Sequence, residues 1–388
     1  MITIKDKSLC AGCSACANIC PKKCIEMVAD ERGFLYPSVK KSECVQCGLC
    51  NKICPFLNPK EVKDDKNAYA AYYKDESVRG VSSSGGLFGC LAKEILNENG
   101  VVFGAAFADD FKSIKHIGIE RKEDLPKLYG SKYLQSVIGD SYKSAENYLK
   151  ADRLVLFVGT SCQVSGLKAY LRKDYDNLLT VDVICHGAPS PLVWRDYVTE
   201  KEQQYGSKIV GANFRNKRFG WGKSVLLLLF ADGSEYCEPG SKDEYMRGFL
   251  TNLYLRESCY KCKCKGNHVL SDISIGDFWG IESVLPNFSD NKGTSAIILN
   301  TTKGKDFFND IRHGLVTETV TYEDVLKGNP ALVKPVEKPS KSDKFWNVYR
   351  KYGLTKAYKK CLKVSLARKC YRFVRRIGSK IKRTIIKK

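Results

Sequence analysis

Short apolar runs alternate with helix-spaced runs through the middle of the chain. Residues 154–158 and 178–184 are strand-sized apolar stretches, and residues 163–171 between them have the apolar spacing of a helix. Another helix is predicted to begin near Pro191, because proline suits the first turn of a helix. This alternation predicts an α/β sheet, and the functional sites of such sheets collect beyond the carboxyl ends of the strands.

The same pattern extends the sheet in both directions along the sequence. Further strands are predicted over the ranges 68–73, 101–107, 225–230, 271–280 and 293–304. A helix is predicted after Gly86 and another over 245–255, and Asp232-Gly233 suits a hairpin turn. Near the N-terminus, two short strands are predicted on either side of Gly33. The expected fold class is therefore a small α+β segment followed by a mixed α/β domain.

The first 55 residues carry one cysteine pattern twice. Each copy reads C-x2-C-x2-C-x3-C-P, and together they use eight of the 18 cysteines. Ferredoxin-type domains hold two 4Fe-4S clusters with this spacing, and the fourth cysteine of each run serves the neighbouring cluster. One predicted cluster is held by the first set, which consists of Cys10, Cys13, Cys16 and Cys54. The other is held by the second set, which consists of Cys44, Cys47, Cys50 and Cys20.

Zinc knuckles and a disulfide framework are the alternatives for such a cysteine-rich segment. Zinc sites pair two C-x2-C units across a spacer, without the C-P ending and without this duplication. We therefore predict a bacterial-ferredoxin-like dicluster domain over 1–57, followed by a charged linker over 58–67. Cysteines arranged for clusters suit a reducing cytoplasm, and the N-terminus lacks the apolar core of a signal peptide.

A further group of cysteines follows the predicted strands. Cys162 and Cys185 come directly after two of these strands, and Cys259 and Cys262 form a C-x2-C pair later in the chain. Four thiolates is the number that a third 4Fe-4S cluster requires. A structural zinc site and separate buried thiols are the alternatives, and Cys264 could replace Cys262 as a ligand.

Other cysteines have no partner at ligand spacing and are interpreted as small apolar residues. These are Cys24, Cys90, Cys237, Cys361 and Cys370.

A Ser-Ser-Ser-Gly-Gly run, residues 82–86, stands just before the predicted helix. Ser84 could cap that helix, and the two glycines would expose backbone N–H groups at its positive end, which suits phosphate binding. Runs of serine and glycine more often form plain turns, so the pattern alone leaves both interpretations open.

Charge distinguishes the end of the chain from its body. The net charge is +21, and from Lys341 onward 18 Lys and Arg stand against one acid, Asp343. Apolar residues such as Phe345, Val364 and Ile381 recur among these cations, as they do in helices that lie on anionic membranes. A solvated helix or a docking arm for an acidic partner is the alternative. Nucleic-acid binding is disfavoured because the body of the chain is close to neutral.

A series of motifs resembles the coenzyme F420 hydrogenase/dehydrogenase beta-subunit family. In order they are S-S-S-G-G, G-S-K-Y-L-Q-S (130–136), V-G-T-S-C-Q-V-S-G-L, D-V-I-C-H-G-A-P-S, F-R-N-K-R-F-G-W, C-Y-K-C and D-I-S-I-G-D-F-W-G. The order of the series is specific, although no single motif is. The resemblance implies an FAD-binding iron–sulfur oxidoreductase. Its implied parts are a region over 68–150 that resembles the family's N-terminal segment, a C-terminal-like domain over 151–335, and a basic helical tail over 336–388 outside the family core.

The resemblance also implies roles for individual residues. Those implied at the flavin phosphates are Ser83, Ser84, Gly85 and Gly86. Those implied along the flavin are Ser131, Lys132 and Tyr133, and those implied as cationic contacts are Lys217 and Arg218. The third set, implied to hold a cluster beside the flavin, is Cys162, Cys185, Cys259 and Cys262. Ser161 stands where the family commonly has proline, and we expect a small effect because the cysteine is retained.

A protein of this kind would join one-electron carriers to two-electron chemistry, because a flavin accepts either. We predict electron transfer between a ferredoxin-like donor or acceptor, the clusters and FAD, ending on a small-molecule two-electron substrate such as coenzyme F420 or another organic acceptor. The cationic tail suggests a bacterial branch linked to surface polysaccharides. A non-catalytic electron-transfer subunit that docks on a partner redox subunit, or a redox module at the inner face of the membrane, are the alternatives.

Overall fold

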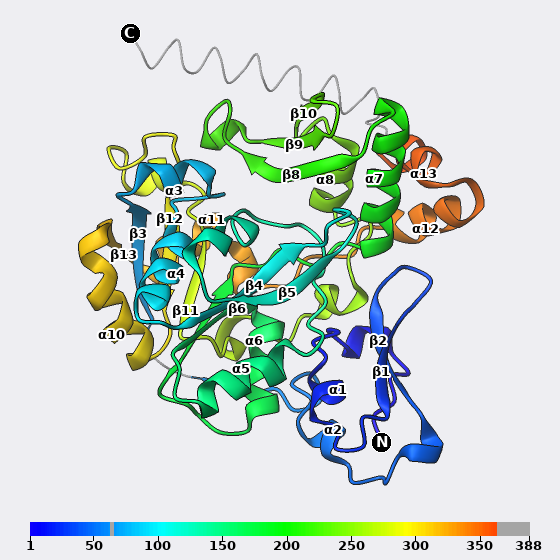
Figure 1. The fold of residues 1–388 in the computed structure, drawn as a ribbon. Helices are drawn as coiled ribbons and strands as arrows, with labels where there is room; N and C mark the ends of the chain where they lie inside the picture. The colour runs from blue at the N-terminus through cyan, green and yellow to red at the C-terminus, as the bar shows by residue number, and fades with distance from the viewer. Residues whose placement is uncertain (63–65, 363–388) are drawn as a thin grey trace. The chain divides into compact units, whose positions relative to one another are not determined.

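The computed structural model describes residues 1–62 and 66–362 of the chain. They fall into two compact units, one ending at Lys338 and the other beginning at Pro339. The first unit contains both the cysteine-rich N-terminal segment and the predicted sheet (Figure 1). Within the described ranges, no helix combines the length and the apolar character needed to cross a membrane.

The cysteine repeat of the sequence is also a structural repeat. In each copy, a 3-10 turn ends beside the first cysteine, a left-handed residue follows the second, and a short helix carries the third. The left-handed residues are Ser14 (φ 62°) and Gly48 (φ 74°). The elements of this segment are α1 (Ala15–Ile19), β1 (Ile25–Ala29), β2 (Leu35–Val39) and α2 (Leu49–Lys52). The two strands pair antiparallel, which confirms the strands predicted around Gly33.

The rest of the first unit is built on one eight-stranded sheet in the order β13-β3-β12-β11-β7-β6-β4-β5. Its strands are β3 (Asn67–Tyr73), β4 (Val101–Phe107), β5 (Ile114–Ile119), β6 (Val155–Thr160), β7 (Leu178–Val183), β11 (Ile273–Asp277), β12 (Ser295–Leu299) and β13 (Leu315–Val320). The central strands β4, β6, β7 and β11 are parallel, and the pairs towards both edges are antiparallel. The predicted mixed α/β fold is confirmed, and its sheet takes strands from both 68–150 and 151–335.

Parallel pairing brings distant chain segments to one edge of the sheet. Thr160 at the end of β6 pairs with Val183 at the end of β7, and Asp277 ends β11 at the same side. Because β12 runs antiparallel to β11, its first residue, Ser295, lies opposite Asp277. Residues that follow β6, β7 and β11 therefore gather with those that precede β12. We call this side of the sheet the carboxyl edge.

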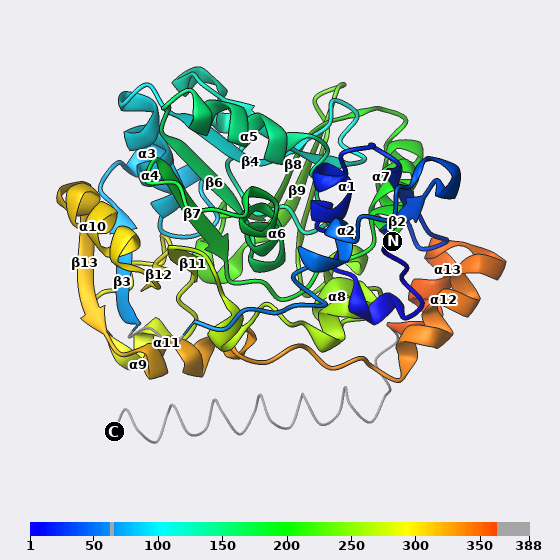
Figure 2. The same ribbon diagram turned by 90° about the horizontal axis from the view of Figure 1, so that it is seen from below.

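Helices cover both faces of the sheet (Figure 2). They are α3 (Glu76–Val81), α4 (Leu87–Asn97), α5 (Ser141–Lys150), α6 (Ser161–Leu171), α9 (Ile281–Val284), α10 (Thr302–Ile311) and α11 (Tyr322–Gly328). Helices α7 (Pro191–Tyr205) and α8 (Glu244–Leu250) instead pack beside the second sheet described below, where Trp194 and Tyr245 contact Phe214. Leu156 of β6 packs with α4 and α10, whereas its neighbour Phe157 packs with α5 and α6. Successive strand side chains point to opposite faces, so the continuous apolar runs predicted for these strands fill two cores at once.

A second, three-stranded antiparallel sheet follows in the order β10-β9-β8. Its strands are β8 (Ile209–Asn216), β9 (Val225–Phe230) and β10 (Glu235–Pro239), with the predicted turn at Gly233 between the last two. The helix predicted over 245–255 is shorter than expected, since α8 ends at Leu250. Asn252 adopts a left-handed conformation (φ 62°) that an α-helix cannot continue through.

The second unit begins with a helical hairpin of α12 (Lys341–Tyr352) and α13 (Leu354–Cys361). Phe345 is fully buried there, with its ring 5.9 Å from that of Tyr358. Phe345, where the apolar positions of the predicted tail begin, therefore packs inside the hairpin. The remaining apolar positions of that prediction, including Val364 and Ile381, lie outside the described residues.

Candidate functional site

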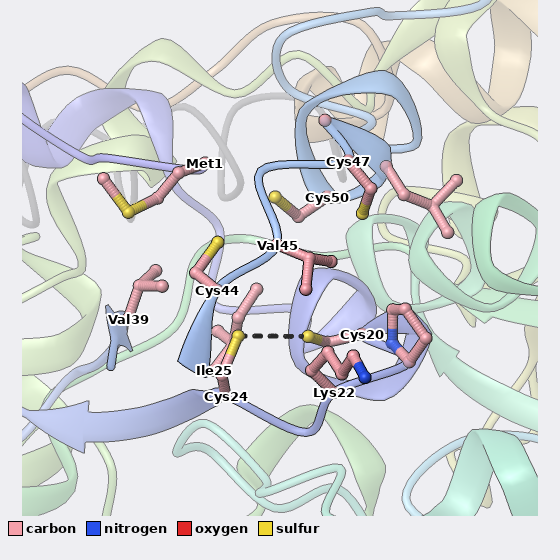
Figure 3. Close-up of a pocket in the computed structure, with 13 residues that line it drawn as sticks. Met1, Cys20, Lys22, Cys24, Ile25, Val39, Cys44, Val45, Cys47 and Cys50 are labelled. Atoms are coloured by element: carbon pink, nitrogen blue, oxygen red, sulfur yellow. Dashed lines mark hydrogen bonds between the residues drawn. The ribbon is translucent and has the colours of Figure 1, made fainter. Parts of the chain in front are cut away.

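The second set of predicted cluster ligands surrounds one pocket (Figure 3), which is lined by Cys20, Cys44, Cys47 and Cys50. Most of the remaining lining is apolar, with Val39 and Val45 among its side chains. Cys47 is exposed, whereas Cys50 is buried. The structure thus gathers the four predicted thiols around one largely apolar hollow and leaves one of them at the surface.

Cys24 also belongs to this pocket, although the sequence analysis interpreted it as an isolated apolar residue. Its Sγ lies 3.5 Å from the Sγ of Cys20, as Figure 3 shows. Cys24 is buried, and a backbone hydrogen bond from Lys23 to the carbonyl of Cys20 turns the chain back between the two cysteines. The signal in the sequence was the short C-P-x2-C spacing after the first cysteine run.

The first set of predicted ligands is more deeply placed. Burial raises the pKa of Cys13 well above its ordinary value, and the nearby thiols of Cys16, Cys10 and Cys54 raise it further. Burial likewise raises the pKa of Cys16 to about 12, again with contributions from Cys10 and Cys54. Four thiols that oppose one another's ionisation need a cationic group between them to become thiolates, and iron is such a group. The donor set therefore fits a cluster.

The third set comes together at the carboxyl edge. Cys162 begins α6 directly after β6, Cys185 follows β7, and Cys259 and Cys262 come from the loop after α8. The pKa of Cys162 is raised to about 12 by burial and by the neighbouring thiols of Cys262 and Cys185. The backbone N–H of Ala188 donates to the Sγ of Cys259 at 3.3 Å. The four side chains thus converge from three separate parts of the chain.

Cys264 lies beside this third set. It is buried, and its hydrogen bond to Cys262 is the main reason that the pKa of Cys262 falls to about 6. The same hydrogen bond is the main cause that raises the pKa of Cys264 itself, followed by burial and by the thiol of Cys162. Both thiols are therefore within reach of the same place, and the choice of Cys262 as the ligand stays a prediction.

The first and third sets are neighbours. Cys54 of the first set and Cys162 of the third pack against one apolar cluster formed by Ala11, Phe56 and Cys264. Helix α1, which carries Cys16, packs on α6, which begins with the turn that holds Cys162. Tyr142 is buried, and both Cys13 and Cys162 contribute to its raised pKa after burial itself. The hydroxyl of Tyr142 therefore lies close enough to both cysteine sets to interact electrostatically with each of them.

The described part of the chain has no site for a single metal ion. Among those residues, no three His, Cys, Asp or Glu side chains converge closely enough to hold one ion. The four thiols of the second set surround a pocket, and a cluster of four irons and four sulfides is larger than one ion.

The residues predicted for the flavin gather around the same edge. The backbone N–H of Ser131 donates to the Oγ of Ser83 at 2.7 Å, which joins two of the quoted motifs. Ser84 donates to the carbonyl of Thr294 at 2.9 Å, and the Nζ of Lys217 donates to the carbonyl of Ser84 at 2.5 Å. Gly85 donates its N–H to Ser295 Oγ at 3.0 Å, and Gly86 immediately precedes α4. The structure thus brings the serine–glycine run and Lys217 together.

Lys132 and Tyr133, the two residues that follow Ser131 in its motif, are half-buried. The Nζ of Lys132 donates to the carbonyls of Leu128, Tyr129 and Gly130, and burial lowers its pKa to about 7. The ring of Tyr133 stacks on that of Phe249 with centroids 4.8 Å apart. The amine of Lys132 therefore holds the local backbone, and its predicted place along a flavin stays a prediction.

Arg218 lies beside the second sheet, and Arg215 lies at the carboxyl edge where Arg218 was predicted. Arg218 pairs with Glu235 of β10 at 2.6 Å, on the second sheet. Arg215 Nη2 forms an ion pair with Asp277 Oδ2 at 3.3 Å, and the guanidinium lies 4.7 Å from the Trp279 ring. Its buried Nε has no hydrogen-bond partner. A buried guanidinium N–H group without an acceptor suits an anion such as a flavin phosphate. Sequence reasoning missed Arg215, although it lies within the F-R-N-K-R-F-G-W motif.

Ser161, the departure from the family pattern, has a clear partner. Its hydroxyl donates to the carboxylate of Asp182, which also accepts from Ser271 and Ser274 at 2.5 Å each. Burial raises the pKa of Asp182, and these hydroxyls oppose that rise. A proline at this position would leave the buried carboxylate with one donor fewer.

Comparison with protein families assigns two segments. Residues 152–325 match the model for the C terminus of the coenzyme F420 hydrogenase/dehydrogenase beta subunit, and residues 9–58 match a 4Fe-4S dicluster domain. The predicted family resemblance is confirmed. These two segments contain all twelve predicted cluster cysteines. Ser83–Gly86 and Ser131–Tyr133 lie outside both.

Among the solved structures similar to this chain is one from the xenon-derivatised F420-reducing NiFe hydrogenase complex of Methanosarcina barkeri. It is 19% identical, with a TM-score of 0.47, and the match covers 78% of this chain and 91% of that chain. A comparison with curated proteins gave no match.

Proposed function

We propose that this protein is an iron–sulfur flavoprotein oxidoreductase that relays electrons among two ferredoxin-type clusters, a third 4Fe-4S cluster and FAD. The match of residues 9–58 supports iron–sulfur electron transfer, and the match of residues 152–325 relates the chain to the F420 hydrogenase/dehydrogenase beta-subunit family. The third cluster, FAD and the substrate are the further content of the proposal.

The observation that carries the proposal is the adjacency of the first and third cysteine sets. Cys54, Cys162 and Cys262 pack against one small apolar cluster. Electron transfer needs its centres close together and shielded from water, and such packing meets both needs. The second set shares a core with the first, because Cys44, Cys50 and Cys54 pack in one apolar cluster. The three sets thus form a continuous series from an exposed thiol to the carboxyl edge.

FAD is proposed at the carboxyl edge beside the third set. Bound there, it would supply the ability to accept electrons one at a time and to pass two to an organic molecule. Arg215 and Lys217 would provide the cationic contacts, and the loop of Ser83 and Ser84 would approach the phosphates. Burial and Arg79 lower the pKa of Lys217 to about 8, and a bound phosphate would oppose that effect by stabilising the ammonium form.

The electron donor or acceptor is proposed to meet the chain at the second set. Cys47 is exposed there, and the neighbouring Val45 is 57% exposed. Lys22 lines the same pocket, so an acidic ferredoxin-like protein would suit the surface. The other end of the relay would serve a two-electron small molecule, coenzyme F420 or another organic acceptor, in a pathway that we propose to be bacterial surface-polysaccharide synthesis.

Cofactor analysis of the whole chain tests this proposal. The protein is purified without oxygen, reconstituted with iron and sulfide, and analysed for iron, acid-labile sulfide and flavin. About twelve irons and one FAD per chain are expected from three four-iron clusters and one flavin. Fewer than about eight irons together with no flavin absorbance would contradict it.

A non-catalytic electron-transfer subunit is the second candidate. The exposed Val45, which lines the same pocket as the exposed Cys47, favours a permanent partner surface, because exposed apolar side chains gather at interfaces. A stable monomer that reduces a small-molecule acceptor without any partner would exclude this candidate.

A further inference from the structure

One arginine of the α/β part reaches into the first cysteine loop. The side chain of Arg256 is 1% exposed, and its Nε donates to the carbonyl of Cys10 at 2.7 Å. Its Nη2 donates to the carbonyl of Leu35 at 2.8 Å and lies 3.6 Å from the Sγ of Cys10, within the range of an N–H···S hydrogen bond. The guanidinium therefore contacts both the backbone and the thiol of a predicted cluster ligand.

The loop is shaped to receive this side chain. Gly12 has a left-handed conformation (φ 69°), and a Cβ atom there would lie 2.9 Å from the Cζ of Arg256. The Tyr36 ring lies 4.2 Å from the guanidinium on another side. Gln135 accepts from Nη1 at 3.1 Å and donates to the carbonyl of Ala11 at 2.7 Å. Arg256 is thus enclosed by the loop, a ring and an amide.

What this pocket lacks, among the described residues, is a carboxylate within ion-pairing distance of Arg256. Its partners are two carbonyls, one amide and one thiol. A buried cation is costly unless an anion accompanies it. The nearest group that can carry negative charge is the Cys10 thiol, and a four-thiolate cluster would carry the charge that balances the guanidinium.

The backbone of Arg256 meets the third set. The N–H of Cys259 donates to the carbonyl of Arg256 at 2.9 Å, and the N–H of Arg256 donates to the carbonyl of Ala188 at 2.9 Å. Ala188 in turn donates to the Sγ of Cys259. A single residue therefore links the thiol of Cys10 in the first set to the loop of Cys259 in the third through two hydrogen bonds.

We propose that Arg256 is a positioning residue that raises the reduction potential of the first cluster and holds that cluster's loop against the third set. This inference deepens the proposed function and rests on it. Reduction adds one negative charge to a cluster, so a buried cation and an N–H···S hydrogen bond stabilise the reduced form more than the oxidised form.

The test is a redox titration followed by electron paramagnetic resonance on the full chain and three variants. Arg256→Met removes the charge and the hydrogen bonds, and Arg256→Lys keeps the charge. Gln135→Met is the matched control, because it removes a neutral contact to the same loop. In Arg256→Met, one of the ferredoxin-type clusters is expected to show at least a tenfold lower ratio of reduced to oxidised form at a fixed potential, which is 59 mV for one electron.

Arg256→Lys and Gln135→Met are expected to change that ratio less than about threefold. A threefold ratio corresponds to about half the free-energy difference of a tenfold ratio. Iron-loaded Arg256→Met with both ferredoxin-type potentials unchanged overturns the inference. If Arg256→Met loses iron, Arg256→Gln is measured instead. The inference is also overturned if Arg256→Lys changes the ratio of reduced to oxidised cluster as much as the uncharged variant does. Iron and flavin content of the wild-type chain tests the proposed function separately, because the Arg256 comparison needs only the two clusters of residues 9–58.

Discussion

Gly166 of α6 lies directly against Cys13. A Cβ atom at Gly166 would come 3.2 Å from the Sγ of Cys13, 3.0 Å from its Cβ and 2.6 Å from the hydroxyl of Tyr142. Because Gly166 has no side chain, the first cysteine set can pack directly on α6, the helix that carries Cys162 of the third set at its start.

Gly166→Val should therefore push α1 away from α6. Overpacking of this kind costs about 1–3 kcal/mol, so the midpoint of thermal unfolding should fall and the first cluster should be lost first on exposure to air. Gly80→Ala is the matched control, because Gly80 also lies in a helix and has nothing within 4 Å of its added Cβ. Equal unfolding midpoints for Gly166→Val and the wild type would show that the two helices are not in contact.

Cys47→Ser should remove the second cluster while leaving the first. The iron content is expected to fall by about four per chain, because serine is a poor ligand for this kind of cluster. Cys24→Ala is the control, since Cys24 lines the same pocket but is not a predicted ligand. Iron analysis with paramagnetic resonance measures both. Loss of iron in Cys24→Ala with retention in Cys47→Ser would reverse the ligand assignment.

Arg215→Met should weaken flavin binding, whereas Arg218→Met should not. The buried Nε of Arg215 lacks an acceptor, and a charge-assisted hydrogen bond to a phosphate is worth about 1.5–3 kcal/mol. That energy is roughly a tenfold to hundredfold change in the dissociation constant of FAD. Arg218 is already paired with Glu235 at the surface. Titration of the apoprotein with FAD by fluorescence measures both constants. A larger loss in Arg218→Met than in Arg215→Met would restore the original sequence-based assignment.

Tyr236→Phe should destabilise the fold more at pH 7 than at pH 4. Asp243 is buried and accepts hydrogen bonds from Tyr197 at 2.5 Å and Tyr236 at 2.9 Å. Burial raises the pKa of Asp243 above its unfolded value, so its contribution to stability is present at low pH and declines as the pH rises through the folded pKa. Removal of one donor raises that pKa further and costs about 1–3 kcal/mol when the carboxylate is ionised.

Denaturant unfolding at the two pH values measures the effect. Tyr205→Phe is the control, because its ring stacks on Phe230 and no hydrogen bond of its hydroxyl is found in the described part of the chain. A destabilisation of Tyr236→Phe that is the same at both pH values would mean that Asp243 does not ionise in the folded protein.

The sequence was most informative where chemistry depends on local spacing. The C-x2-C-x2-C-x3-C-P runs predicted the sets of Cys10 and Cys44 because neighbouring ligands of a cluster follow one another along the chain. The βα alternation likewise placed Cys162 and Cys185 at strand ends, since parallel strands share one carboxyl edge.

The sequence was least informative where a contact depends on tertiary packing. Arg215 and Arg218 stand three residues apart in one motif, and only the course of β8 and the turn after it decides which of them faces Asp277. Arg256 carries no spacing signal, because its partners Cys10 and Leu35 are more than 200 residues away. The helix predicted to reach residue 255 stopped early because Asn252 turned left-handed, which apolar periodicity does not reveal.

The position of β3 has a consequence for how the protein is made. This strand leaves the ribosome soon after residues 9–58, yet both of its sheet neighbours, β12 and β13, are synthesised more than 200 residues later. Residues 9–58 can therefore receive iron while the sheet is still open on one side. The N-terminal cysteines are thus synthesised and accessible before the chain contains Arg256, the residue that encloses Cys10 in the finished fold.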